Sequence, residues 1–213
     1  MPDHKRTVAV LLEQYGQSYA HQAGIRLADK PAPLYQLLVL ATLLSARISG
    51  DIAVAAASEL FKAGYRTPKA MHEASWQDRV DALGRGHYKR YDERTATMLG
   101  DGAGLLLERW SGDLRKLHDE GGDDTGRLTS LLTEFPGIGP SGAGIFLREV
   151  QGIWTGVAPY LDQKVVDGAR QVGLPEQQVA KLAGGKIVEL ASALIRVALS
   201  KGAADEVKKA ARA

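Results

Sequence analysis

Cysteine is absent from the 213 residues, and aromatic residues are scarce. Without cysteine the chain cannot form disulfides, thiolate metal sites or cysteine-ligated iron–sulfur clusters. Aromatic residues make up only 6% of the sequence, whereas glycine is frequent, with 24 residues. This balance favours closely packed helices over a β-sandwich, because strands are enriched in aromatic residues and depleted in glycine.

The sequence also lacks a long hydrophobic run and a strong net charge. The longest apolar stretch, Leu34 to Ala46, contains Gln36 and is too short to cross a bilayer. The first residues lack the apolar core and cleavage site of a signal peptide. A formal net charge of +2 permits nucleic acid as a partner but does not require it. We therefore expect a cytoplasmic protein with no membrane contact.

Apolar residues recur at helical spacing through most of the chain. Leu34, Leu37, Leu38, Ala41 and Leu44 follow one another at steps of three and four residues where a buried helix face requires it, and no segment alternates as a strand would. The predicted fold class is therefore all-α. Further helices are predicted for 51–62 with Asp51 as N-cap, from Thr67-Pro68, for 88–110, for 126–135, from Asp162, for 186–200 and, frayed, for the tail.

The most informative stretch is LLTEFPGIGPSGAGIFLREV, in which Pro136-Gly137-Ile138-Gly139 joins two predicted helices. Glycine permits backbone conformations that side chains forbid and lets the backbone approach a ligand closely. Pro140 suits the first position of the second helix, whose free N–H groups would favour an anion such as a DNA phosphate. An ordinary helix–helix turn would show the same spacing.

Gly142 and Gly144 lie just inside the second of these helices, where each costs roughly 1 kcal/mol relative to alanine. We infer that another helix or a substrate approaches this helix closely. The sequence leaves both alternatives open.

Four blocks of the chain, in order, resemble the superfamily that contains endonuclease III, adenine glycosylase and alkyladenine glycosylase. The blocks are PLYQLLVLATLLSARISGD, GRGHYKRYDERTATML, LLTEFPGIGPSGAGIFL and YLDQKV, and together they span roughly residues 5–175. The resemblance implies a helix-hairpin-helix DNA glycosylase with two helical lobes flanking a DNA-binding groove. The expected lobes are residues 30–135 and residues 1–29 plus 136–213, the second lobe carrying the second hairpin helix and the catalytic aspartate.

The resemblance implies that Asp162 is the catalytic residue, because it falls where the family places its aspartate. A carboxylate near the anomeric carbon would stabilise the positive charge that develops as an N-glycosidic bond breaks. Asp162 could also simply cap its own helix, and the two roles are compatible, but the resemblance favours catalysis. Asp167, on the same helix, is expected to be a solvated charge.

Ser141 departs from the bifunctional relatives, which carry a lysine at this hairpin position. Serine cannot form a Schiff base, so the resemblance implies an enzyme that leaves an abasic site without cutting the strand. Lys164 could conceivably substitute, although surface charge is its expected role. Pro140 stands where relatives often have an arginine. The hairpin therefore has one cationic side chain fewer to bind a DNA phosphate. We expect no catalytic metal and no cofactor, in particular no iron–sulfur cluster, although a monovalent cation could bind at the hairpin.

Arg47 stands where relatives place a polar residue that fills the gap left by a flipped base. Its donors could also contact the orphaned base. A helix-end arginine bound to C-terminal carbonyls is an equal alternative. His87 stands where relatives place a wedge residue, and a surface loop histidine is its competitor.

Several more residues complete the expected site. Arg85, Lys89 and Arg90 surround His87 and could hold phosphates, or form an ordinary solvated face. Pro136, Gly137, Ile138, Gly139, Ser141 and Gly142 are the expected DNA contacts of the hairpin. Tyr160 and Trp154 could stack on a base in a pocket, with core packing the better expectation for Trp154.

The predicted function is that of a monofunctional DNA glycosylase, a monomer that acts on double-stranded DNA and flips a damaged or mispaired base out of the duplex. A non-catalytic DNA-binding protein on the same scaffold is the first alternative, and it is favoured by the missing lysine. An unrelated helical protein is the second alternative. The sequence does not identify the base.

Overall fold

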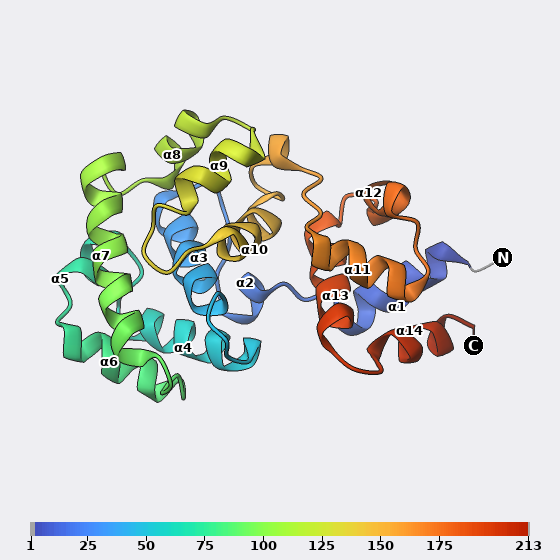
Figure 1. Ribbon diagram of the computed structural model, residues 1–213, viewed down its shortest axis with the longest axis horizontal. Helices are drawn as coiled ribbons and strands as arrows, with labels where there is room; N and C mark the ends of the chain where they lie inside the picture. Colours follow the sequence, from blue (N-terminus) through green and yellow to red (C-terminus); the bar gives the residue numbers. More distant parts are fainter. Residues whose placement is uncertain (1–2, 213) are drawn as a thin grey trace. The chain divides into compact units, whose positions relative to one another are not determined.

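All regular secondary structure in residues 3–212, the part of the chain that the computed structural model describes, is helical (Figure 1). The predicted all-α class is confirmed. The chain divides into two compact units. The larger unit comprises residues 19–157, and the smaller unit combines residues 3–18 with residues 158–212. No helix within residues 3–212 is long and apolar enough to span a membrane.

The larger unit is one continuous stretch of chain with ten helical segments between residues 19 and 157. They are α2 (Tyr19–Gln22), α3 (Pro31–Leu44), α4 (Gly50–Lys62), α5 (Pro68–Glu73), α6 (Trp76–Arg85), α7 (Asp92–Trp110), α8 (Leu114–Gly121), α9 (Thr125–Leu132), α10 (Pro140–Val150) and the short 3₁₀ turn η1 (Thr155–Val157).

The centre of the larger unit is α3, which contacts α4, α7, α8 and α10 (Figure 1). Leu34, Leu37, Leu40 and Leu43 on this helix are completely buried. Each buried leucine side chain contributes about 1.5–3 kcal/mol relative to an exposed one. The helix is apolar around most of its circumference because its neighbours cover it on several sides.

The smaller unit brings the two ends of the described chain together. Its helical segments are α1 (His4–Tyr15), α11 (Gln163–Val172), the 3₁₀ turn η2 (Glu176–Gln178), α12 (Val179–Ala183), α13 (Ile187–Leu199) and α14 (Ala203–Arg212). Helix α13 packs against α1 and α11. Gly168 of α11 lies so close to Leu194 of α13 that a Cβ there would overlap the Leu194 carbonyl. This glycine therefore sets how closely the two helices approach.

The helix ends largely follow the predicted signals. Thr67 caps α5, because its Oγ1 accepts a hydrogen bond from the Ala70 N–H, and Asp162 caps α11. The predicted N-cap Asp51 is wrong, because α4 begins one residue earlier and Ser49 Oγ accepts from the Ile52 N–H. Asp51 instead lies in the first turn, where a carboxylate favours the positive end of the helix dipole.

The two units have boundaries that differ from the expected lobes of residues 30–135 and 1–29 plus 136–213. Residues 19–29 and 136–157 belong to the larger unit. The physical reason is that α10 packs against α3 and α9, so the second helix of the hairpin shares the core of the first.

Candidate functional site

The hairpin between α9 and α10 is held by two buried side chains. Phe135 and Ile138 are only 3% and 4% exposed, and the Ile138 N–H donates to the Phe135 carbonyl at 3.0 Å. Ile138 was expected to contact DNA, but its side chain points into the core and anchors the loop instead. Any contact made at this position must therefore involve the backbone.

Gly137 must be a glycine for internal reasons. Its φ is +86°, in the left-handed region that other residues rarely adopt. A Cβ at this position would lie 3.0 Å from Met98 Sδ and 3.2 Å from Thr42 Cγ2. The loop is therefore packed directly onto α7 and α3 at this point.

Gly139, by contrast, is not required to be glycine by its backbone conformation or by packing. Its φ of −95° and ψ of −174° describe an extended backbone that any residue adopts. A Cβ built on Gly139 would meet nothing within 4 Å, and the residue is exposed. Packing within the larger unit therefore does not explain this glycine, and its bare backbone faces open space.

The N-terminus of α10 differs from that of α11 in what satisfies its amides. No side chain caps α10, Pro140 occupies its first turn, and that turn has no acidic residue. By contrast, Asp162 caps α11 with its carboxylate. Ser141 is exposed in the first turn of α10. Unsatisfied N–H groups and the positive end of the helix dipole make such a terminus favourable for an anion.

Gly142 is explained by packing between helices. A Cβ on Gly142 would overlap Ser45 Oγ, which itself donates to the Ala41 carbonyl at 2.6 Å. Of the two alternatives for this residue, the close approach of another helix is therefore the one found, and this packing accounts for the glycine without a ligand. Gly144 is likewise buried. The close contact joins the start of α10 to the end of α3.

Arg47 follows the end of α3 and is exposed. The last carbonyls of α3 already accept hydrogen bonds, since the Ser45 N–H reaches Ala41 O and Thr42 O and the Ala46 N–H reaches Leu43 O. Among residues 3–212, Arg47 makes no hydrogen bond or ion pair. The helix-end alternative for Arg47 therefore lacks the contacts on which it depends.

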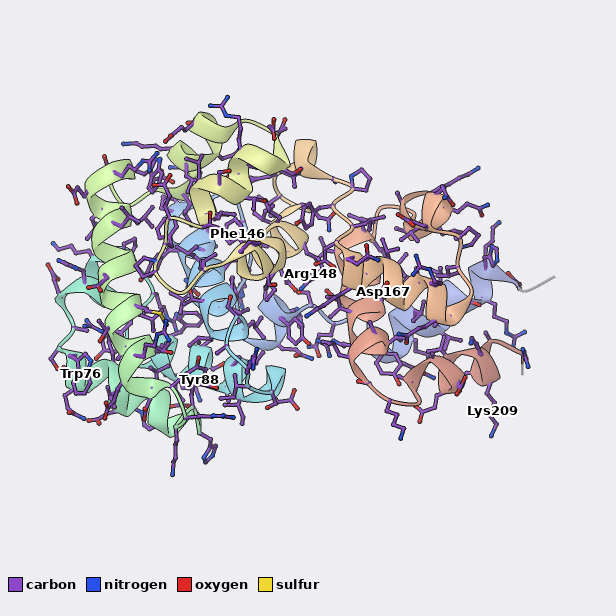
Figure 2. All side chains as sticks on the ribbon, viewed as in Figure 1. Trp76, Tyr88, Phe146, Arg148, Asp167 and Lys209 are labelled. Carbon is purple, nitrogen blue, oxygen red and sulfur yellow. The ribbon has the colours of Figure 1, made fainter. Side chains whose placement is uncertain are left out.

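His87 is exposed on a tight turn between α6 and α7. Its φ is +64°, one of two positive values among non-glycine residues 3–212. The preceding Gly86 lies against the Ala56 backbone, where a Cβ would not fit. The following Tyr88, labelled in Figure 2, is fully buried, and burial raises the pKa of its hydroxyl. Two fixed neighbours thus hold His87 outward in a strained conformation.

The cations around His87 are not equivalent. Arg85 pairs with Glu59 at 3.6 Å, and the hydrogen bond from Lys62 is the main reason that the pKa of Glu59 is lowered. Arg90 lies over the Tyr91 ring at 5.3 Å. Lys89 is exposed, with no ion pair to any residue within 3–212. Lys89 is therefore the cation of this turn with neither an ion pair nor a ring contact among residues 3–212.

Asp162 belongs to the smaller unit and is half-buried. Its Oδ1 accepts a hydrogen bond from the Val165 N–H at 3.0 Å, which is the capping geometry. Lys164 is exposed, and Tyr160 is half-buried. Asp167 accepts from Gln163 and Arg170 on the surface of α11 (Figure 2), as expected for a solvated charge.

Trp154 is not available to a base. It is 3% exposed, its ring stacks on His118 at 4.2 Å between centroids, and Phe146 (Figure 2) packs at 5.5 Å. Its indole N–H donates to Asp29 at 3.3 Å. Core packing, the better expectation for Trp154, is therefore the role found, because His118, Phe146 and Asp29 tie the ring and its N–H into the core of the larger unit.

The side chains that pack beneath the hairpin were not identified from the sequence. Tyr35, Thr42, Met98 and Phe135 line a cavity of about 10 Å³ beneath it, room for about one water molecule. Tyr35 and Thr42 lie on α3, Met98 lies on α7 and Phe135 lies in the loop after α9, so periodicity does not predict that they meet. Residues 3–212 contain no group of His, Cys, Asp or Glu that could hold a metal ion.

No protein-family model matches the sequence, and no curated protein matches it. One solved structure that is similar is that of a trapped endonuclease III–DNA covalent intermediate in an estranged-adenine complex. The two chains are 18% identical, the alignment covers 90% of this chain and 84% of that chain, and the TM-score is 0.47.

Proposed function

We propose that this protein is a monofunctional DNA glycosylase that hydrolyses the N-glycosidic bond of a damaged or mispaired base in double-stranded DNA. The observation that carries the proposal is the hairpin. Gly139 is exposed with no internal packing reason to be glycine, and it directly precedes an uncapped helix N-terminus. A bare backbone and free amides together suit a DNA phosphate.

Arg47 and His87 supply contacts with the bases in this proposal. Arg47 has only donors, is exposed, and is not held by the carbonyls of α3. It would occupy the gap left by the flipped nucleotide. His87 would enter the base stack, and its fixed backbone removes part of the entropy that a flexible loop would lose on binding. Lys89 would hold a neighbouring phosphate.

Asp162 performs the chemistry in this proposal. As the bond between C1′ and the base nitrogen breaks, positive charge develops on the sugar, and the carboxylate stabilises it. The base leaves with the bonding electron pair, water adds to C1′, and Asp162 accepts a proton from that water. Ser141 has no amine, so the hairpin forms no Schiff base, and the product is an intact strand with an abasic site.

A non-catalytic DNA-binding protein remains the second candidate, and one observation favours it. The Asp162 carboxylate already accepts the Val165 N–H as the cap of α11. A helix cap alone accounts for an aspartate at this position.

The test compares Asp162→Asn with Asp167→Asn on duplexes that each carry one uracil, oxidised pyrimidine, alkylated purine or mismatch. Asparagine caps a helix about as well as aspartate, so Asp162→Asn keeps the fold and removes only the charge. Asp167→Asn removes a surface carboxylate from the same helix. We expect strand breaks only after alkali treatment, lost in Asp162→Asn and retained in Asp167→Asn.

Each other outcome has a definite meaning. Strand breaks without alkali would show lyase activity and contradict the role given to Ser141. Base release that survives in Asp162→Asn would remove Asp162 from the mechanism. Salt-sensitive binding to duplex DNA with no base release on any duplex would support the non-catalytic candidate.

A further inference from the structure

Met98 lies directly behind the hairpin. It belongs to α7, is partly exposed, and lines the small cavity together with Thr42 and Pro136. A Cβ on Gly137 would be 3.0 Å from Met98 Sδ and 3.1 Å from its Cε. The thioether therefore supports the one loop residue whose backbone is in the left-handed conformation.

Met98 is also the methionine of residues 3–212 that is not buried. The sequence has no cysteine and three methionines, Met1, Met71 and Met98. Met71 is completely buried, and Met1 lies outside the described residues. Because thioether oxidation follows exposure, a mild oxidant that reaches residues 3–212 should react at Met98 and spare Met71.

We propose that Met98 is an oxidation site whose conversion to the sulfoxide displaces the hairpin and weakens its grip on DNA. The oxidant is a hydroperoxide such as hydrogen peroxide. A sulfur lone pair attacks the terminal peroxide oxygen, the O–O bond breaks, and the products are methionine sulfoxide and water. The DNA consequence rests on the proposed function, whereas the displacement of the hairpin does not.

The geometry explains why one added oxygen matters. The cavity of about 10 Å³ holds about one water and is lined mostly by apolar side chains, among them Leu38, Val39 and Phe135. A sulfoxide oxygen is strongly polar and costs free energy where it finds no hydrogen-bond partner. Either Met98 must swing out and leave Gly137 unsupported, or Gly137 must move. Both responses shift the backbone that precedes Gly139 and α10.

The test treats the full chain and a Met98→Leu variant with hydrogen peroxide. Leucine keeps the apolar volume and removes the sulfur, and this variant still contains Met1 as a matched control. Peptide mass spectrometry would measure oxidation at Met98 and Met71. Amide hydrogen exchange would report the hairpin, and fluorescence anisotropy would report affinity for a DNA duplex.

We expect oxidation at Met98 but not at Met71, faster exchange of the Ile138 amide, which donates to the Phe135 carbonyl in the hairpin, and a roughly tenfold loss of DNA affinity, the effect of about one lost charge-assisted hydrogen bond. Met98→Leu should keep its affinity and its exchange rates under peroxide. Unchanged hairpin exchange after Met98 is oxidised, or equal losses in Met98→Leu, would overturn the proposal. If untreated protein binds no DNA, the proposed function fails, and the exchange data still decide whether Met98 controls the hairpin.

Discussion

The left-handed backbone of His87 links stability and function at a single residue. Glycine adopts this conformation without strain, so His87→Gly should raise the free energy of unfolding by up to about 1 kcal/mol. The same change removes the imidazole that is proposed to enter the base stack, so base release should fall. Denaturant unfolding and single-turnover base release would measure the two effects.

His87→Asn is the matched control, because asparagine also tolerates a positive φ but has no ring to stack. It should keep the stability of the native protein and lose base release as His87→Gly does. Full activity in both variants would show that the imidazole of His87 is not needed for base release.

Asp162 has a capping role that can be separated from its proposed chemistry. Asp162→Ala removes the acceptor for the Val165 N–H and should lower the free energy of unfolding by about 1 kcal/mol. Asp162→Asn should leave stability within about 0.5 kcal/mol of the native value. Urea unfolding of the two variants would check this, and equal losses would show that the charge itself stabilises α11.

At the level of the hairpin, the two loop glycines should behave oppositely. Gly137→Ala places a Cβ against Met98 and forces a positive φ on alanine, so unfolding should become easier by about 2 kcal/mol. Gly139→Ala meets no protein atom, so stability should stay within about 0.5 kcal/mol. DNA affinity should nevertheless fall in Gly139→Ala.

Thermal unfolding and DNA titrations of both variants would test this contrast. Unchanged affinity in Gly139→Ala would show that no ligand approaches that backbone closely, and the hairpin would then be an ordinary helix connection.

The elements themselves follow from local signals in the sequence. Helical spacing in α3, the Thr67-Pro68 start of α5 and the Pro-Gly-Ile-Gly loop all predict what is found, because each depends on neighbouring residues. The reason for Gly142 could not be predicted, because Ser45 comes from another helix. Core packing was the better expectation for Trp154, but its partners His118, Phe146 and Asp29 could not be predicted, because they converge only in the folded unit.

At the scale of the whole molecule, acid should destabilise the fold, because some carboxylates have a lower pKa in the folded state than in the unfolded state. The pKa of Glu120 is lowered, first by the hydrogen bond from the Trp110 indole and then by Arg109, and the pKa of Asp113 is lowered mainly by Arg115. A lowered folded-state pKa contributes stability above the unfolded-state pKa, and this contribution is lost as pH falls through the folded-state value.

Thermal unfolding should therefore be insensitive to these groups from pH 7 to pH 5, and the melting temperature should drop below about pH 4.5, the usual value for a glutamate. Glu120→Gln keeps an oxygen acceptor for the Trp110 N–H but removes the charge. Its melting temperature should be lower at pH 7 and should change less on acidification. An equally steep decline in this variant would exclude Glu120 as a contributor.

Salt dependence tests how a chain of net charge +2 binds a polyanion. The binding would depend on a few local cations, so Lys89→Ala should reduce the slope of log affinity against log salt concentration by about one. Lys69→Ala removes an exposed lysine of α5 that already pairs with Glu73, and it should leave the slope unchanged. Equal slopes in all three proteins would remove Lys89 from the interface.

The order of segments in the smaller unit has a consequence for synthesis on the ribosome. Helix α1 buries Val8 and Leu11, and its packing partners α12, α13 and α14 come last in the described chain. The whole of the larger unit, residues 19–157, is translated in between and contains α4, α7, α8 and α10, the helices that pack against its core helix α3. The larger unit can therefore fold before α1 has its partners, so the nascent chain exposes one apolar helix face, which a holdase chaperone would recognise, until α12, α13 and α14 have been synthesised.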